Sequence, residues 1–168
     1  MRVFAIDPGN VKSALCIIDA ETLRPLYQVI LPNEDILRKI RSYKFDEEDE
    51  AAIEMLQSYG NLIGRDVLET AVWIGRFYEA FIRRLSAQRV PHMIFRMQEK
   101  MHICQDSRAG DSNIRRALID RFCDHDFKNG KGTLKNPDWF FGFSKDMWAA
   151  YAVGLTYIEN DLRKDNEK

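Results

Sequence analysis

Cysteine and histidine are scarce in this chain of 168 residues, which contains three of each. Cys16, Cys104 and Cys123 lie far apart, no two of them have Cys-x-x-Cys spacing, and the histidines are equally dispersed. Because structural zinc sites use closely spaced ligand pairs, the sequence argues against one. The odd number of dispersed cysteines instead predicts reduced thiols in or near the core of a cytoplasmic protein.

Long apolar runs and an excess of one charge are also missing. No apolar stretch approaches the ~18 residues of a membrane span, and Arg2 leads directly into an apolar segment, so we expect neither a membrane partner nor a signal peptide. The formal net charge of −1 gives no support to nucleic-acid binding, although local patches matter more than the total. The length and the 45% hydrophobic content predict a single domain over residues 1–168.

Hydrophobic patterns predict an α/β fold. Strands are expected at residues 2–7, 12–19, 26–31, 51–56 and 92–97, and helices after a cap at Asn33, at 64–88, at 98–105, at 110–123 and at 144–164 with Ser144 as its cap. The first three strands follow one another so closely that they predict an antiparallel meander, since parallel neighbours need a longer crossover. The later strands alternate with helices, which predicts a mixed five-stranded sheet with helices on both faces.

Two segments are expected to be loops. Residues 46–50 form a run of five acids, which is typical of a solvated loop. Residues 124–143 are rich in glycine and polar side chains and predict irregular structure before the last helix.

Three carboxylates stand in unusual places. Asp7 ends the first predicted strand, and Glu54 lies inside a strand that is apolar on both sides, where a carboxylate is costly unless it is paired or bound to a metal. Asp146 begins a helix that is apolar almost all round and should pack flat on the sheet, with its first turn facing the strand ends. Hard divalent cations prefer such oxygen ligands, and two ions can hydrolyse a phosphodiester.

Each acid also has a simpler explanation. Asp7 precedes Pro-Gly-Asn and fits turn chemistry. Glu54 fits a strand-end acid paired with an arginine, and Asp146 fits the preference of acids for helix starts. The metal hypothesis therefore depends on all three meeting in space.

The same segments resemble the RuvC Holliday-junction resolvases of the ribonuclease H-like superfamily. FAIDPGNVKSALCIID resembles their first strand and turn, and AAIEMLQSYG resembles the strand that supplies their second acid. DSNIRRALIDRF, followed by GFSKDMWAAYAVGLTYIE, resembles the phage and prophage branch. The resemblance covers nearly the whole chain in order. It implies a ribonuclease H-like sheet, a homodimer, two Mg²⁺ or Mn²⁺ ions per active site and paired incisions in a four-way DNA junction.

By position, the resemblance makes Asp7, Glu54 and Asp146 catalytic metal ligands. Bacterial members carry a further Asp one helical turn after the last acid, where this chain has Ala149. A three-acid site, an enzyme of reduced activity and replacement by another group are all open. Asp111 is our candidate replacement, and it is equally explained as a helix-start acid.

Positive charge is expected to hold DNA. Lys12 and Lys145 lie beside the acids in sequence, where they either stabilise charge on the phosphate or balance the carboxylates. The stretch 96–121 and the loop 128–135 supply the expected backbone contacts, which are Arg108, Arg115, Lys128, Lys131 and Lys135. The alternative for these residues is ordinary solubilising charge.

Two aromatic features complete the resemblance. Tyr59 follows Glu54 by five residues and is our candidate for the family's aromatic that inserts at the junction centre, with simple packing as the alternative. The stripe Trp73, Phe77, Tyr78 and Phe81 is typical of a core, and the resemblance implies that part of it lies at the dimer contact.

Other functions remain open. Ala149 favours a protein of the same fold that binds branched DNA without cutting it. A related nuclease that acts on RNA or on flaps would use the same acids. An actin-like phosphotransferase also begins with a strand and Asp-x-Gly, but that architecture needs a duplicated domain and roughly twice the length.

Overall fold

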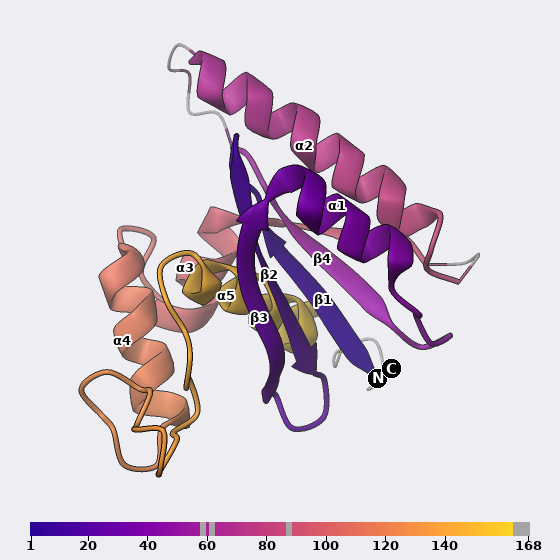
Figure 1. The fold of residues 1–168 in the computed structure, drawn as a ribbon. Coiled ribbons are helices and arrows are strands. Elements are labelled where there is room, and N and C mark those ends of the chain that lie inside the picture. Colours follow the sequence, from indigo (N-terminus) through magenta and orange to yellow (C-terminus); the bar gives the residue numbers. More distant parts are fainter. Residues whose placement is uncertain (58–59, 61–62, 87–88, 163–168) are drawn as a thin grey trace.

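One mixed sheet forms the centre of the protein (Figure 1), whose computed structural model describes residues 1–57, 60, 63–86 and 89–162. Its strands are β1 (Arg2–Asp7), β2 (Lys12–Asp19), β3 (Pro25–Pro32), β4 (Glu50–Met55) and β5 (His92–Phe95), in the spatial order β3-β2-β1-β4-β5. The β1–β2 and β2–β3 pairs are antiparallel, and the β1–β4 and β4–β5 pairs are parallel. The predicted antiparallel meander followed by two parallel strands is confirmed.

Helices cover both faces of this sheet. One face carries α1 (Asn33–Ser42) and α2 (Arg65–Ile82). The other carries α3 (Arg96–Cys104), α4 (Asp111–Phe122) and α5 (Met147–Tyr157), which continues into the short π-helix η1 (Ile158–Leu162). In Figure 1, α5 lies behind the strands and α1 and α2 lie on the opposite side. Among the described residues, none of these helices is long and apolar enough to span a membrane.

Two hydrophobic cores result, one on each face. Strand side chains alternate between the faces, so that Val3 and Ala5 join the core under α5 while Phe4 and Ile6 join the core under α1 and α2. α5 packs flat on β1 and β2, as its all-round apolar sequence predicts. Gly154 makes this approach possible, because an added Cβ would lie 2.8 Å from the Cβ of Ala5.

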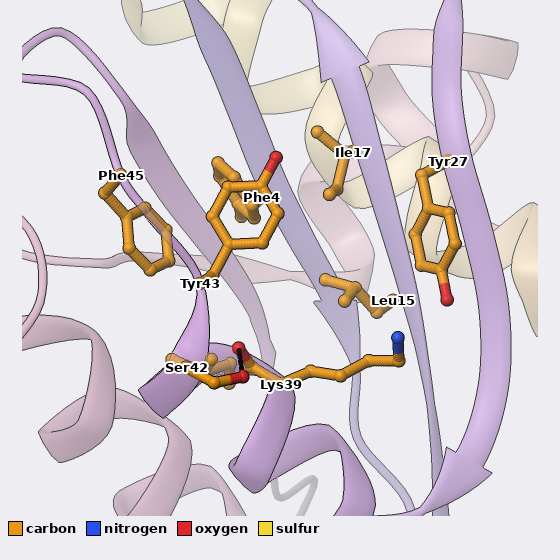
Figure 2. A pocket seen from close by; sticks show the side chains of 9 residues that line it. Phe4, Leu15, Ile17, Tyr27, Lys39, Ser42, Tyr43 and Phe45 are labelled. Atoms are coloured by element: carbon orange, nitrogen blue, oxygen red, sulfur yellow. Dashed lines mark hydrogen bonds between the residues drawn. The ribbon is translucent and has the colours of Figure 1, made fainter.

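A small hollow opens on the α1 face of the sheet. It encloses about 280 Å³, and its lining includes Phe4 and Leu15 from the sheet and Tyr43 and Phe45 from the segment after α1. Figure 2 shows the Lys39 side chain running along it toward β2 and β3. The hollow belongs to the face whose core contains Phe4 and Leu15, so the sheet separates it from side chains on the α5 face.

The acidic run at 46–50 is only partly a solvated loop. Asp49 is 1% exposed and accepts hydrogen bonds from the backbone N–H and the side chain of Arg2, and Asp46 also pairs with that guanidinium at 2.7 Å. Glu50 begins β4 and is ion-paired with Arg89. Two of the five acids are therefore buried, because arginines distant in sequence neutralise them.

Both predicted helix caps are wrong. α1 begins at Asn33 itself, whose side chain is buried, and α5 begins only at Met147. Ser144 lies one turn earlier, in the loop. By contrast, the prediction of unpaired thiols is confirmed, since all three cysteines are described and free, with two of them buried.

Candidate active site

Asp7 and Glu54 lie side by side at one edge of the sheet. β1 and β4 are parallel, and their register pairs Ala5 with Ala52 and Ile6 with Ile53, so the next residues in register are the two acids. Ala5 and Ala52 belong to the core under α5, and alternation places both carboxylates on that same face. Their side chains lie close enough for Glu54 to contribute to raising the pKa of Asp7.

The turn after Asp7 is held by buried polar groups. The side-chain amide of Asn33 donates to the carbonyl oxygen of Gly9 at 2.8 Å, and the hydroxyl of Ser13 donates to the amide oxygen of Asn33 at 2.6 Å. The backbone N–H of Gly9 donates to Ser13 at 3.2 Å. Any Cβ at Gly9 would collide with the carbonyl oxygen of Lys12. Turn chemistry thus explains Pro8 to Asn10, but it does not use the carboxylate of Asp7.

Asp146 approaches the pair from the start of α5. It is the N-cap residue and it is exposed, but its carboxylate makes no capping hydrogen bond within the described chain. Its charge instead contributes to raising the pKa of Asp7. The three predicted acids therefore lie within electrostatic range of one another.

Glu99 joins this group, although we did not predict it. It lies in α3 directly after β5, its side chain is fully buried, and its Oε2 is 2.5 Å from Nη1 of Arg96. Its Oε1 is buried without a hydrogen-bond partner among the described residues. β5 is parallel to β4, so α3 begins at the edge where β4 ends. The sequence signal that could have identified Glu99 is its position directly after a strand that runs parallel to the strand of Glu54.

The site carries more negative charge than its surroundings neutralise. Burial raises the pKa of Asp7 well above its ordinary value, and the charge and hydrogen bond of Glu54 raise it further, followed by the charges of Asp146 and Glu99. Burial and the charge of Glu54 raise the pKa of Glu99 to about 8, against the opposing charge of Arg96. Glu99 therefore favours the protonated form at neutral pH, and the pKa of Asp7 is shifted in the same direction.

The donor atoms of these side chains suit a hard divalent cation, but their present arrangement does not surround one. Within the described part of the chain, no three His, Cys, Asp or Glu side chains are arranged so that they could hold a metal ion. However, all four acids offer oxygen donors, one buried carboxylate oxygen is unpartnered, and the raised pKa values indicate missing positive charge. Mg²⁺ and Mn²⁺ satisfy such a donor set, and the side chains would have to turn toward the ion.

Asp111 lies at the rim of this cluster. Its side chain is 93% exposed at the start of α4 and is ion-paired with Arg96, which also binds Glu99. The structure therefore brings Asp7, Glu54, Asp146 and the unpredicted Glu99 together, and it places Asp111 in solvent beside them.

A basic hollow of about 420 Å³ adjoins Asp146. It is lined by Asp111, Ser112, Arg115, Arg116, Ile119, Lys128, Lys145, Asp146 and Trp148. The guanidinium of Arg115 packs over the ring of Trp148 at 4.9 Å, which orients it along the wall. Lys145 is exposed beside Asp146 and adopts a positive φ of 43°. Three residues that we predicted to contact phosphate (Arg115, Lys128 and Lys145) thus share one surface with a candidate catalytic acid.

Other predicted DNA contacts lie elsewhere. Lys12 is exposed at the start of β2, Arg108 is 92% exposed before α4, and Lys131 and Lys135 lie in the 124–143 loop; none of them lines the basic hollow. Tyr59 lies outside the described residues.

Part of the basic stretch at 96–121 is used internally. Arg116 binds Asp120 and Arg121 binds Glu159, while Arg96 binds the acids described above. Each of these three arginines therefore has a carboxylate partner, although Arg116 also lines the basic hollow.

Comparison with known proteins identifies the architecture. No family model matches the chain, and no curated protein matches it. A structure of Thermus thermophilus RuvC superposes with a TM-score of 0.62 at 17% sequence identity, covering 94% of this chain and 93% of that one. T. thermophilus RuvC in complex with a Holliday junction substrate superposes with a TM-score of 0.63 at 15% identity, covering 94% and 92%. The sheet order, the helices on both faces and these two superpositions show that the chain has the RuvC-like, ribonuclease H-like fold.

Proposed function

We propose that this protein is a divalent-metal-dependent endonuclease that resolves four-way DNA junctions by paired phosphodiester hydrolysis, with residues 1–168 as one cytoplasmic nuclease domain. The observation that carries the proposal is the convergence of Asp7, Glu54 and Asp146 at the edge of the sheet, beside a basic hollow. A protein with the same fold has been solved with a Holliday junction substrate, which supports branched DNA as the partner.

The roles follow from position and chemistry. Asp7, Glu54 and Asp146 would hold two Mg²⁺ or Mn²⁺ ions, which when bound supply an activated water and stabilise the leaving oxygen. The register of β1 and β4 fixes the first two acids rigidly, while Asp146 faces the solvent side from which a phosphate arrives.

Cationic side chains beside the acids would hold the DNA backbone. Lys145, next to Asp146, donates hydrogen bonds to the scissile phosphate and stabilises its charge. Arg115 and Lys128, on the wall of the same hollow, bind the flanking phosphates and set the position of the strand. Lys12, Arg108, Lys131 and Lys135 are proposed to contact more distant parts of the junction, and Tyr59 to stack at its centre.

Paired incision needs two active sites, and α2 offers a surface for a homodimer. Phe77 and Phe81 are fully buried against the sheet, and the other two aromatics of the stripe are partly buried against the same core. The opposite side of α2 exposes Leu68, Val72 and Ile82 at 56%, 62% and 43%. An isologous contact between two such helices would bury these side chains and relate the two sites by a two-fold axis.

A synthetic four-way junction tests the proposal. In the presence of Mg²⁺ or Mn²⁺, the wild type is expected to introduce paired nicks, and Asp7→Asn is expected to lower the cleavage rate by about 10³-fold or more while still binding the junction. RNA duplexes and flaps of matched sequence serve as competing substrates. Absence of metal-dependent cleavage by the wild type, or equal cleavage by Asp7→Asn, would contradict the proposal.

A second candidate function is binding of branched DNA without cleavage. Ala149 and the lack of a ready-made three-ligand arrangement among the described residues favour it. Tight junction binding without incision by the wild type, together with a gain of cleavage in Ala149→Asp, would establish this alternative.

A further inference from the structure

We propose that Glu99 is the fourth acidic group of the active site and supplies the metal-binding carboxylate that the first turn of α5 lacks. This inference rests on the proposed function, since it assigns a residue to the same site. It differs from the expectation that Asp111 fills that place.

Topology brings Glu99 to the right edge of the sheet. Glu54 is paired with Ile94 in β5, and α3 begins two residues later, at Arg96. Glu99 therefore lies in the first turn of a helix that starts where β4 and β5 end, close enough for Glu54 to be the strongest charge acting on it. α3 also packs against α5, the helix that carries Asp146. Glu99 thus reaches the site from α3, whereas an acid at position 149 would reach it from α5.

An unpartnered oxygen gives the second observation. The side chain of Glu99 is fully buried, yet only Oε2 is bound, and Oε1 has no hydrogen-bond partner within the described chain. Leaving a buried carboxylate oxygen unsatisfied is unfavourable, so such atoms are rare in folded proteins unless a ligand completes them. A bound cation would give this oxygen a partner and would supply the positive charge that the cluster of carboxylates lacks.

Arg96 shows where positive charge is favoured. Its guanidinium binds Glu99 and Asp111 together. Burial alone would lower its pKa, but the charges of Glu99, Glu54 and Asp111, together with the hydrogen bond to Glu99, raise the pKa above its ordinary value. The arginine is therefore the resident counter-charge of the cluster, and it satisfies one oxygen of Glu99 while leaving the other available.

Asp111 is a poorer candidate on the same criteria. Its side chain is 93% exposed, so water solvates both carboxylate oxygens and neither needs a further partner. Ala149, in the first turn of α5, offers no oxygen at all. Of these three positions, Glu99 alone combines burial, an unpartnered oxygen and proximity to Glu54.

Metal binding by the full chain without DNA tests the inference. Mn²⁺ affinity is measured by electron paramagnetic resonance of the free ion for the wild type, Glu99→Gln, Asp111→Asn and Asp7→Asn. Glu99→Gln is expected to weaken Mn²⁺ binding at least about 10-fold, as loss of a ligand commonly does, and Asp111→Asn by less than about 2-fold. Glu34→Gln is the matched control, because Glu34 also pairs with an arginine, Arg76 at 2.8 Å, but from the other face of the sheet.

The outcomes separate this inference from the proposed function. Wild-type Mn²⁺ affinity in Glu99→Gln, or a larger loss in Asp111→Asn, overturns the role of Glu99 even if the wild type cleaves junctions. A wild type that binds Mn²⁺ through Glu99 but cuts no junction contradicts the nuclease alone. If Glu99→Gln fails to fold, Glu99→Asp replaces it in the measurement, because this variant keeps the carboxylate but has a shorter side chain. A weaker Mn²⁺ affinity in that variant supports the inference, and an unchanged affinity overturns it.

Discussion

Asp138 is a buried carboxylate that organises the loop between α4 and α5. It accepts hydrogen bonds from the backbone N–H groups of Asp124, His125, Asp126 and Trp139 at 2.6–3.0 Å. Burial raises its pKa, but these donors outweigh burial and hold the pKa well below the ordinary value of 3.8. The glycine-rich sequence of this segment predicted irregular structure, and a single side chain explains how that structure becomes fixed next to Lys128.

Replacing this carboxylate should make the fold less stable, and the difference should depend on pH. Asp138→Asn presents an amide to backbone donors, so we expect a loss of about 2–3 kcal/mol in the free energy of unfolding at neutral pH. A carboxyl with a depressed folded-state pKa stabilises fully above its unfolded pKa and progressively loses that contribution as pH falls. Urea denaturation of both proteins between pH 7 and pH 3 should show the gap closing below about pH 5. A constant gap would contradict this account.

At the scale of elements, the close packing of α5 on the sheet determines where Asp146 lies. A Cβ on Gly154 would lie 2.5 Å from Ile18 Cδ1 and 2.8 Å from Ala5 Cβ. In β1 and α5, periodicity and composition predicted the buried faces correctly because apolar burial dominates there. The predicted cap at Asn33 was wrong and the solvated loop at 46–50 was only partly right, because the partners of these side chains (Gly9 and Ser13 for Asn33, and Arg2 for Asp49) come from distant segments.

Two glycine substitutions test this packing. Gly154→Ala should gain about 1 kcal/mol of helix propensity but lose about 1–3 kcal/mol to overpacking against Ala5, giving a net loss. Gly75→Ala, in α2, meets nothing within 4 Å and should stabilise the protein by about 1 kcal/mol. Equal changes of the two denaturation midpoints at one protein concentration would show that the sheet tolerates a larger side chain under α5.

At the scale of the whole molecule, the sheet separates the candidate active site from the candidate dimer surface. The acids and the basic hollow lie with α3, α4 and α5, while the exposed apolar side of α2 lies on the opposite layer. The overall topology was predictable because short connections force a meander and longer ones allow crossovers. The burial of Glu99 was not predictable, because it arises from the packing of α3 against α4, α5 and β5 rather than from the local sequence.

Disrupting the outer side of α2 should affect assembly without affecting the fold. Val72→Glu places a charge at the centre of the exposed apolar surface, so we expect a monomer in light scattering, with an unchanged circular dichroism spectrum and single nicks replacing paired incisions. Leu26→Glu changes an apolar side chain that is 55% exposed on β3 and should leave assembly unaltered. Identical masses for wild type and Val72→Glu would rule out α2 as the contact.

The pairing of Ala5 with Ala52 limits where insertions and deletions can be tolerated as this sequence evolves. Since side chains alternate along a strand, gaining or losing one residue inside β1 or β4 would send one carboxylate to the layer of α1 and α2, away from its companion. Length variation among descendants of this sequence should therefore collect in connections such as 44–49 and 124–143, and the two strands should keep their number of residues.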